Sequence, residues 1–228
     1  MESKTMISFS SENSKGDCPG SLSGDITKSR KGLIVLQEWW GMNEQIRNQA
    51  LDLATKRNFI TLVPDLYRGK CSDDREEAGH LMAGLDWMGA VKDIQGAAKY
   101  LISKGCAKVG VTGFCMGGAL SLAAAALVPE ISASAPFYGI PSPDLCDVTK
   151  ITIPVQGHFA ELDNLVGFSS PKDAQELKRK CDAANVPLTL YIYEGVDHGF
   201  NHVGGPNYNE EFSTLALKRM SDFMSEHL

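Results

Sequence analysis

Short apolar runs alternate along the chain with longer segments whose apolar residues recur at helical spacing. The runs at 32–36, 59–63 and 109–112 are largely apolar or β-branched, which is typical of strands covered on both faces. Segment 86–103 instead repeats its apolar residues every three or four positions, which predicts an amphipathic helix. Alternation of this kind predicts an α/β fold, a three-layer sandwich with a mostly parallel central sheet.

The other expected elements follow from the same pattern. They are strands at 134–139, 151–157 and 187–193, and helices at 43–56, 72–83, 118–127, 171–185 and 209–227. Residues 1–31 carry the weakest signal: an edge strand fits 6–10, and the Gly, Pro and Ser residues of 11–21 predict a loop. No linker divides the sequence, so we expect one domain over residues 1–228, with the order of 1–31 left open.

Composition narrows the class of partner. The chain has 228 residues, of which 43% are hydrophobic, so one sizeable core is possible. Its net charge is −6, with 22 Lys and Arg against 28 Asp and Glu, which argues against nucleic acid and anionic membranes as partners. No apolar run approaches the roughly 20 residues of a membrane span. We expect a monomer or a small homo-oligomer that acts on a small molecule.

The six cysteines are scattered, and no two of them form a C-x-x-C pair. The N-terminal segment is polar and lacks an apolar signal core. We therefore expect reduced thiols and a cytoplasmic location rather than a disulfide framework.

Residues 113–117 read Gly-Phe-Cys-Met-Gly between an expected strand and an expected Ala-rich helix. This is the context of a nucleophile elbow, a tight turn that needs small residues beside the nucleophile. Cys115 would lie at a helix N-terminus, where free N–H groups and the helix dipole stabilise a thiolate. The Met116 N–H would point toward a developing oxyanion. The alternative is a buried structural cysteine, but the flanking strand and helix favour catalysis.

Three expected strand-end loops each carry one group of a nucleophilic triad. The order is Cys115, Asp163 and then His198, which is the α/β-hydrolase order of nucleophile, acid and histidine. In this arrangement Cys115 attacks a carbonyl carbon to form a thioester. His198 takes and returns the proton, and Asp163 orients the imidazole.

Alternatives remain open for two of the three groups. Glu161 competes with Asp163, because both are expected in the loop after 151–157, together with His158. The rivals of His198 are the other four histidines, His80, His158, His202 and His227. No cluster of histidines and carboxylates has metal-ligand spacing, so we expect neither a metal nor a cofactor.

A carboxylate and two aromatic residues follow the expected strand at 32–36. Glu38, Trp39 and Trp40 would lie at the carboxyl edge of the sheet, where open α/β sheets bind their ligands. An ordinary surface loop is the alternative for Glu38, but the adjacent aromatic residues favour a site.

From about residue 32 to the C-terminus the sequence resembles the dienelactone hydrolase (carboxymethylenebutenolidase) family of α/β-hydrolases. The motifs that carry the resemblance are Gln-Glu-Trp-Trp-Gly at 37–41, Pro-Asp-Leu-Tyr at 64–67, Gly-Phe-Cys-Met-Gly-Gly at 113–118 and Gly-Val-Asp-His-Gly-Phe at 195–200. Together these motifs are specific, although each alone would not be.

The resemblance implies a role for each matching residue. Cys115, Asp163 and His198 match the catalytic triad. Glu38 matches a carboxylate that helps to ionise the cysteine when substrate arrives, and Trp39 matches the residue whose N–H completes the oxyanion hole with Met116. Arg75 falls where the family has an arginine that pairs with a substrate carboxylate.

The sequence departs from the family pattern at the substrate pocket. His202 stands where the best-known members have a second carboxylate-binding arginine, and a histidine is a weaker, pH-dependent partner for an anion. Trp39 and Trp40 replace smaller apolar residues, so we expect a reshaped pocket with Trp40, Arg75 and His202 in contact with substrate.

The leading hypothesis is a cysteine hydrolase that opens lactones or small esters through a Cys115 thioester. A non-catalytic ligand-binding or electrophile-sensing protein on the same fold is the alternative. A reversible thiol switch at Cys115 is a third possibility, weakened because no resolving cysteine lies nearby in the sequence.

Overall fold

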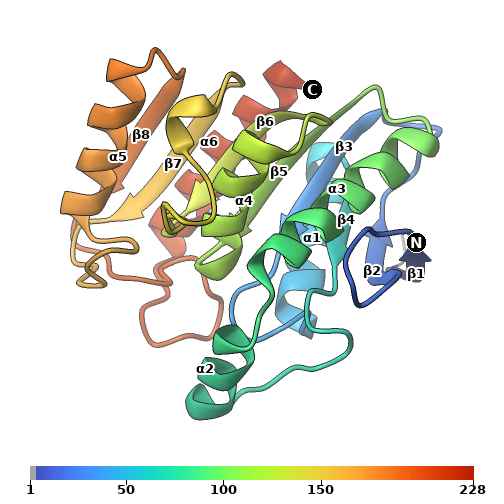
Figure 1. Ribbon diagram of the computed structural model, residues 1–228, viewed down its shortest axis with the longest axis horizontal. Coiled ribbons are helices and arrows are strands. Elements are labelled where there is room, and N and C mark those ends of the chain that lie inside the picture. Colours follow the sequence, from blue (N-terminus) through green and yellow to red (C-terminus); the bar gives the residue numbers. More distant parts are fainter. Residues whose placement is uncertain (1–3) are drawn as a thin grey trace.

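A computed structural model describes residues 4–228 and contains one eight-stranded sheet between two layers of helices (Figure 1). The strands are β1 (Thr5–Phe9), β2 (Cys18–Ser23), β3 (Lys31–Leu36), β4 (Ile60–Pro64), β5 (Lys108–Phe114), β6 (Ile131–Phe137), β7 (Val155–Ala160) and β8 (Leu188–Tyr193). Their spatial order is β1-β2-β4-β3-β5-β6-β7-β8. Strands β3 to β8 run parallel, whereas β1 and β2 pair antiparallel at one edge. The predicted mostly parallel sandwich is confirmed.

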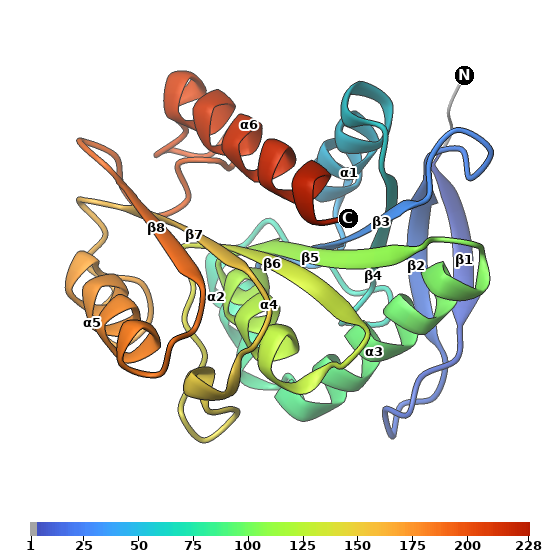
Figure 2. The ribbon, with the colours of Figure 1, turned by 90° about the horizontal axis from the view of Figure 1, so that it is seen from above.

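The helices divide between the two faces of the sheet. They are α1 (Glu44–Arg57), α2 (Arg75–Ala83), α3 (Trp87–Ser103), α4 (Met116–Leu127), α5 (Pro171–Ala183) and α6 (Glu210–His227), with a 3-10 turn η1 at Val148–Lys150. Figure 2 shows α1 and α6 on one face and α3, α4 and α5 on the other. Most of the long helices begin where an Asn, Asp or Ser side chain caps the first turn, as Asn43 does for α1 and Asn209 for α6.

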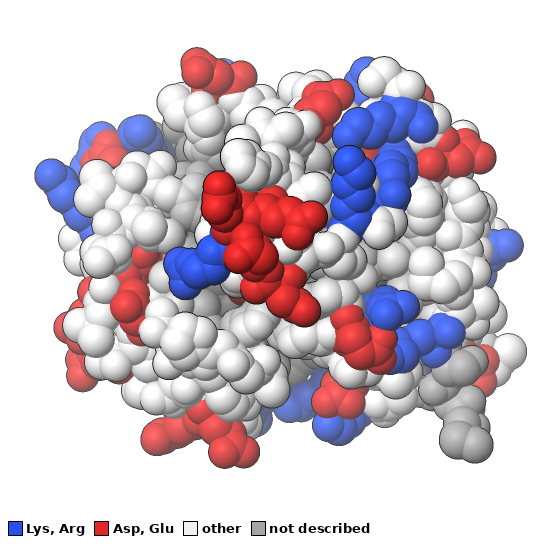
Figure 3. Space-filling model, turned by 90° about the horizontal axis from the view of Figure 1, so that it is seen from below, with Lys and Arg blue, Asp and Glu red and all other residues white. Residues whose placement is uncertain are grey.

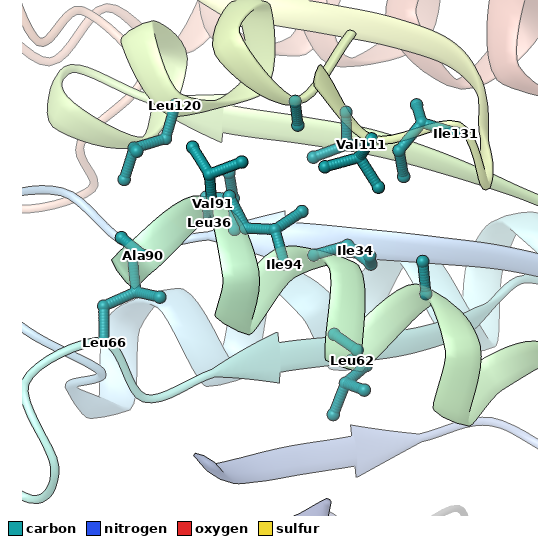
Figure 4. Packing of buried hydrophobic residues seen from close by; sticks show 14 of the residues in the cluster. Ile34, Leu36, Leu62, Leu66, Ala90, Val91, Ile94, Val111, Leu120 and Ile131 are labelled. Atoms are coloured by element: carbon teal, nitrogen blue, oxygen red, sulfur yellow. The ribbon is translucent and has the colours of Figure 1, made fainter. Parts of the chain in front are cut away.

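The core between the sheet and α3 and α4 is continuous and apolar. Ile34, Leu36 and Leu62 point from adjacent strands toward Val91 and Ile94 on α3 (Figure 4). Each of these side chains is almost fully buried, which contributes about 1.5–3 kcal/mol per large aliphatic residue. The helical spacing of apolar residues in 86–103 therefore marks the face of α3 that covers the sheet.

The expectation that 11–21 is only a loop was wrong at its C-terminal end, because β2 begins at Cys18. Proline and glycine usually interrupt strands, but Pro19 and Gly20 lie within β2 and take part in its pairing. A Cβ at Gly20 would lie 3.0 Å from Leu62 Cδ1, so glycine permits the close approach of β2 to β4. The edge strand expected at 6–10 is confirmed as β1.

The strand expected at 151–157 begins later and extends further than predicted. Pro154 precedes β7 and has no N–H to donate to a ladder, so pairing starts at Val155. His158 was expected in the following loop, but it lies within β7 and is fully buried. Its ring nitrogens lie 2.9 Å from the Tyr193 hydroxyl and 3.0 Å from Gln156 Oε1. Burial, with a smaller effect of Arg219, lowers the pKa of His158 to about 3, so this ring is a neutral part of the core.

The parallel run of β3 to β8 brings the carboxyl ends of these strands to one edge of the sheet. The loops after β3, β5, β7 and β8 meet at this edge, and α2 projects beside them outside the three layers (Figure 1). Among the described residues, no helix has the length and apolarity needed to cross a membrane.

Candidate active site

The turn between β5 and α4 holds Cys115 in a strained backbone conformation. Its φ is 54° and its ψ is −116°, which is unfavourable for any residue with a side chain and costs about 1–3 kcal/mol. The turn closes only because its neighbours are small. A Cβ at Gly113 would lie 2.2 Å from the Gly117 carbonyl oxygen, and one at Gly117 would lie 2.6 Å from the Leu36 carbonyl oxygen. This geometry is that of the predicted nucleophile elbow.

Cys115 is nearly buried, with 9% of its surface exposed, and its backbone is tied to the sheet. Its N–H donates to the Phe137 carbonyl at 3.1 Å, and its own carbonyl accepts from Ala119 in α4 at 3.1 Å. The residue precedes α4 directly, so the positive end of the helix dipole lies next to it.

His198 and Asp163 meet beside the cysteine, although they come from loops after β8 and β7. His198 Nδ1 lies 2.7 Å from Asp163 Oδ2, and the Leu165 N–H donates to Asp163 Oδ1 at 3.0 Å. Burial raises the pKa of Asp163, but the hydrogen bond from His198 and the other donors outweigh it, so the net shift is downward. Asp163 is therefore an ionised acceptor that holds the proton of His198 on Nδ1.

The imidazole is poised to carry a charge. Burial lowers the pKa of His198, but hydrogen bonds to Asp163 and Cys115, together with their charges, raise it to about 10. With Nδ1 facing Asp163, the other ring nitrogen is left for the sulfur. The three groups that the sequence placed in one triad are thus brought together, while Glu161 accepts from the Gly195 N–H at 2.9 Å instead.

Two backbone amides near the cysteine, those of Met116 and Trp39, have no partner among the described residues. Met116 begins α4 and Trp39 lies in the loop after β3. Within residues 4–228, neither backbone N–H donates to another protein group. Free, fixed N–H groups next to a nucleophile are the requirement for an oxyanion hole.

Glu38 is buried beside the site and has partners that the sequence did not indicate. One carboxylate oxygen accepts from the Tyr138 hydroxyl at 3.4 Å, and the other forms a short hydrogen bond with His202 Nδ1. This bond to Glu38 raises the pKa of His202, against the opposing effect of burial. Burial and the nearby charge of Glu38 raise the pKa of Tyr138, so its hydroxyl stays protonated. The position of His202 is therefore set by an ion pair inside the protein.

Sequence reasoning missed Tyr138, Phe168 and Ser169. The Tyr138 ring packs edge-on against His198 at 5.0 Å, and the Phe168 ring lies 6.3 Å from it. The Ser169 hydroxyl lies 3.2 Å from His198 Nδ1. The position of Tyr138 directly after β6 was a usable signal, whereas the other two lie in a long loop without a distinctive pattern.

A cavity of about 690 Å³ opens over the sulfur. Its lining includes Trp39 and Trp40 from the loop after β3, Arg75 and Met82 from α2, and Leu165, Val166 and Phe168 from the loop after β7. Glu38, His198 and His202 also line it, so all the predicted substrate-contacting residues border one space. The Arg75 guanidinium carbon lies 5.7 Å from the centroid of the Trp39 ring, in a cation–π contact.

Comparisons with known proteins agree with this architecture. The model of the dienelactone hydrolase family matches residues 22–228. Protein usf of Aquifex pyrophilus is 34% identical over 181 residues, 74% of this chain and 76% of that protein. Carboxymethylenebutenolidase of Pseudomonas putida is 28% identical over 221 residues, 90% of each chain. The structure of a Klebsiella pneumoniae protein, provisionally described as a dienelactone hydrolase, covers 97% of this chain and 99% of its own with a TM-score of 0.81 at 24% identity.

The sheet, its flanking helices and the structural match define an α/β-hydrolase fold. The chain belongs to the dienelactone hydrolase family, and it is a hydrolase that acts on ester bonds. The family resemblance drawn from four short motifs is confirmed over nearly the whole described chain.

Proposed function

We propose that this protein is a cysteine hydrolase that opens lactones or small esters through a thioester on Cys115. The observation that carries the proposal is the short contact between His198 and Asp163 next to the strained elbow cysteine. A merely structural cysteine would need neither a strained turn nor a histidine held in one tautomer by a buried carboxylate.

In the first half-reaction, the Cys115 thiol transfers its proton to His198, and the sulfur attacks the carbonyl carbon of the substrate. The carbonyl oxygen becomes an oxyanion, which accepts hydrogen bonds from the Met116 and Trp39 N–H groups. The bond between the carbonyl carbon and the ester oxygen then breaks, and the His198 imidazolium protonates the departing oxygen. The acyl group remains on the sulfur as a thioester; in a lactone the alcohol stays attached to it.

In the second half-reaction, water attacks the thioester while neutral His198 takes one of its protons. A second oxyanion forms in the same hole and collapses by breaking the carbon–sulfur bond. The products are the Cys115 thiolate, with a proton on His198, and a carboxylic acid, which releases its remaining proton to solvent and leaves as a carboxylate. Asp163 accepts the Nδ1 proton throughout and stabilises the imidazolium.

Glu38 is proposed to help ionise Cys115, which requires it to change partners. Its carboxylate is bound to His202 and Tyr138 in the structure. A substrate that displaces His202 would release one carboxylate oxygen toward the thiol proton. Trp40, Arg75 and His202 are the proposed substrate contacts, because all three line the cavity.

The proposed setting is the cytoplasm, as a monomer or a small homo-oligomer. All six cysteines are unpaired, including the exposed Cys71, which is expected of a protein kept in a reducing compartment.

A pair of cysteine variants tests the proposal. Cys115→Ala should lower kcat on p-nitrophenyl acetate by at least about 10³-fold, because no other group can form the thioester. Cys71→Ala, which changes an exposed thiol, should stay within about twofold of the original protein. Full turnover by the Cys115→Ala protein would reject the nucleophile.

A trapping experiment separates turnover from mere binding. Brief reaction with a β-lactone followed by mass spectrometry should place an acyl group on Cys115. A ligand that binds without acylation, together with no hydrolysis of any ester in a panel, would instead support a sensing protein.

A further inference from the structure

The charges around the cavity suit one kind of substrate. Among the lining residues the only lysine or arginine is Arg75, against the carboxylates Glu38 and Asp197. The turn that begins α2 carries four further exposed carboxylates beside Arg75, namely Asp73, Asp74, Glu76 and Glu77. Figure 3 views the molecule from the side on which α2 projects, and Asp and Glu side chains gather near the centre of that face. An anionic substrate would approach this entrance against its field.

One of the two cations in the site is already paired, and the other is surrounded by carboxylates. His202 is bound to Glu38, so its charge is already compensated inside the protein. The Arg75 guanidinium lies against the Trp39 ring, and its neighbours in the sequence are the acidic residues of the α2 turn. A substrate carboxylate would therefore compete with Glu38 for His202, and near Arg75 it would be repelled by these acidic residues.

The walls of the cavity are aromatic and apolar, and the apolar surface continues to the rim. The Trp39 and Trp40 rings meet edge-on at 5.0 Å, and Phe168 also lines the cavity. At the rim Leu165 is 43% and Val166 is 86% exposed, which is unusual for large apolar side chains on one loop. The cavity of about 690 Å³ falls within the roughly 300–1,000 Å³ range of pockets that hold drug-sized ligands.

We infer that this site selects uncharged esters or lactones that carry a ring or another bulky apolar group, and that it rejects substrates with a free carboxylate. The Trp39–Trp40 wall and the Leu165–Val166 rim bind the apolar group, while the acidic turn of α2 excludes the anion. The inference rests on the proposed cysteine hydrolase function and adds the substrate class to it.

Three p-nitrophenyl esters test the two halves of this inference. They are the 3-phenylpropanoate, the 3-(4-carboxyphenyl)propanoate, which differs only by a remote carboxylate, and the acetate. We expect kcat/KM for the phenylpropanoate to exceed that for the acetate by at least about tenfold, because even one methylene in an apolar pocket is worth that much. We expect the carboxylated ester to be at least about tenfold poorer than the phenylpropanoate. A preference for the carboxylated ester, or for the acetate, overturns the inference.

Variants assign the selection to particular residues. Trp40→Ala should lower the ratio of phenylpropanoate to acetate activity by about tenfold. The double change Asp73→Asn with Glu76→Gln should raise relative activity on the carboxylated ester by about two- to fourfold near 0.01 M salt, where screening is weak. The matched control is Glu176→Gln on α5, which removes a partly exposed carboxylate that does not line the cavity and should leave both ratios unchanged. Unchanged ratios in the first two variants would overturn the assignment.

Failure of the inference and failure of the proposed function give different results. If Cys115→Ala removes all activity but the carboxylated ester is preferred, the mechanism stands and the substrate class is wrong. Binding can also be measured without turnover in the Cys115→Ala protein, through quenching of tryptophan fluorescence. Methyl 3-phenylpropanoate should then bind at least about tenfold more tightly than its 4-carboxylated analogue, and the reverse order would reject the inference alone.

Discussion

Replacing Asp163 by Asn removes the charge that faces His198 while keeping the shape of the side chain. The carboxylate oxygen lies 2.7 Å from Nδ1, and the other oxygen accepts from the Leu165 N–H, a contact that an amide oxygen can keep. The asparagine NH₂ would then face Nδ1 and donate to it. That contact places the ring proton on Nε2, the nitrogen that should accept from the thiol, so the imidazole is held in the wrong tautomer.

The size of the effect follows from the contact that is lost. A hydrogen bond to a charged group contributes about 1.5–3 kcal/mol, and one pKa unit corresponds to about 1.4 kcal/mol. The pKa of His198, raised to about 10 in the intact site, should therefore fall by about one to two units in Asp163→Asn. The wrong tautomer acts in addition, so kcat should fall by about 10²–10⁴-fold.

Two measurements check this expectation. Titration of the His198 C2–H signal by NMR reports the pKa, and ester hydrolysis reports kcat. The control is Glu161→Gln, the rival carboxylate, whose acceptor oxygen can still bind the Gly195 N–H and whose kcat should stay within about twofold. An unaltered His198 titration with unaltered kcat in Asp163→Asn, or a larger loss in Glu161→Gln, would refute the assignment of the acid.

Three further predictions concern the surroundings of the triad. Gly117→Ala should destabilise the fold by at least about 1–3 kcal/mol in urea unfolding, because the new Cβ would meet the Leu36 carbonyl at 2.6 Å; a change below 0.5 kcal/mol, about the scatter of surface substitutions, would contradict this. Glu38→Gln should lower the raised pKa of His202. A raised histidine pKa stabilises the fold at low pH, and this contribution fades as the pH rises through the folded-state pKa, so the variant should lose more stability at pH 5 than at pH 9. Equal losses at the two pH values would count against the ion pair. His158, with a pKa lowered to about 3, should show no NMR titration between pH 5 and 9, and the fold should lose stability as the pH falls below about 6.5; a midpoint near 6.5 would show that the ring is not held neutral.

Most of the fold could be predicted because its signals are local. Apolar runs such as 32–36 and 59–63 became buried strands, and the helical spacing in 86–103 became the covered face of α3. The failures at β2 and β7 have a common cause. Proline and glycine usually end strands, but Gly20 permits the close approach of β2 to β4, and Pro154 delays the start of β7. Such effects depend on neighbours far away in the sequence.

The sequence was sufficient to predict those site residues whose position depends only on where a strand ends. Cys115, Asp163 and His198 follow three parallel strands, and the carboxyl ends of parallel strands must share an edge. The bond between His202 and Glu38 could not be predicted, because it joins side chains 164 positions apart. Its formation depends on how the loop after β8 folds back over the loop after β3, and no local pattern encodes that.

Helix α2 packs less extensively against the rest of the molecule than the other helices do. Only Ala78 of its residues is buried, and the helix lies outside the three layers, as Figure 1 shows. The sequence of α2 can therefore be mutated, or replaced as a whole, with little loss of folding stability. Because α2 borders the mouth of the cavity, new substrate preferences can arise there by mutation, while the strained elbow and its histidine are preserved.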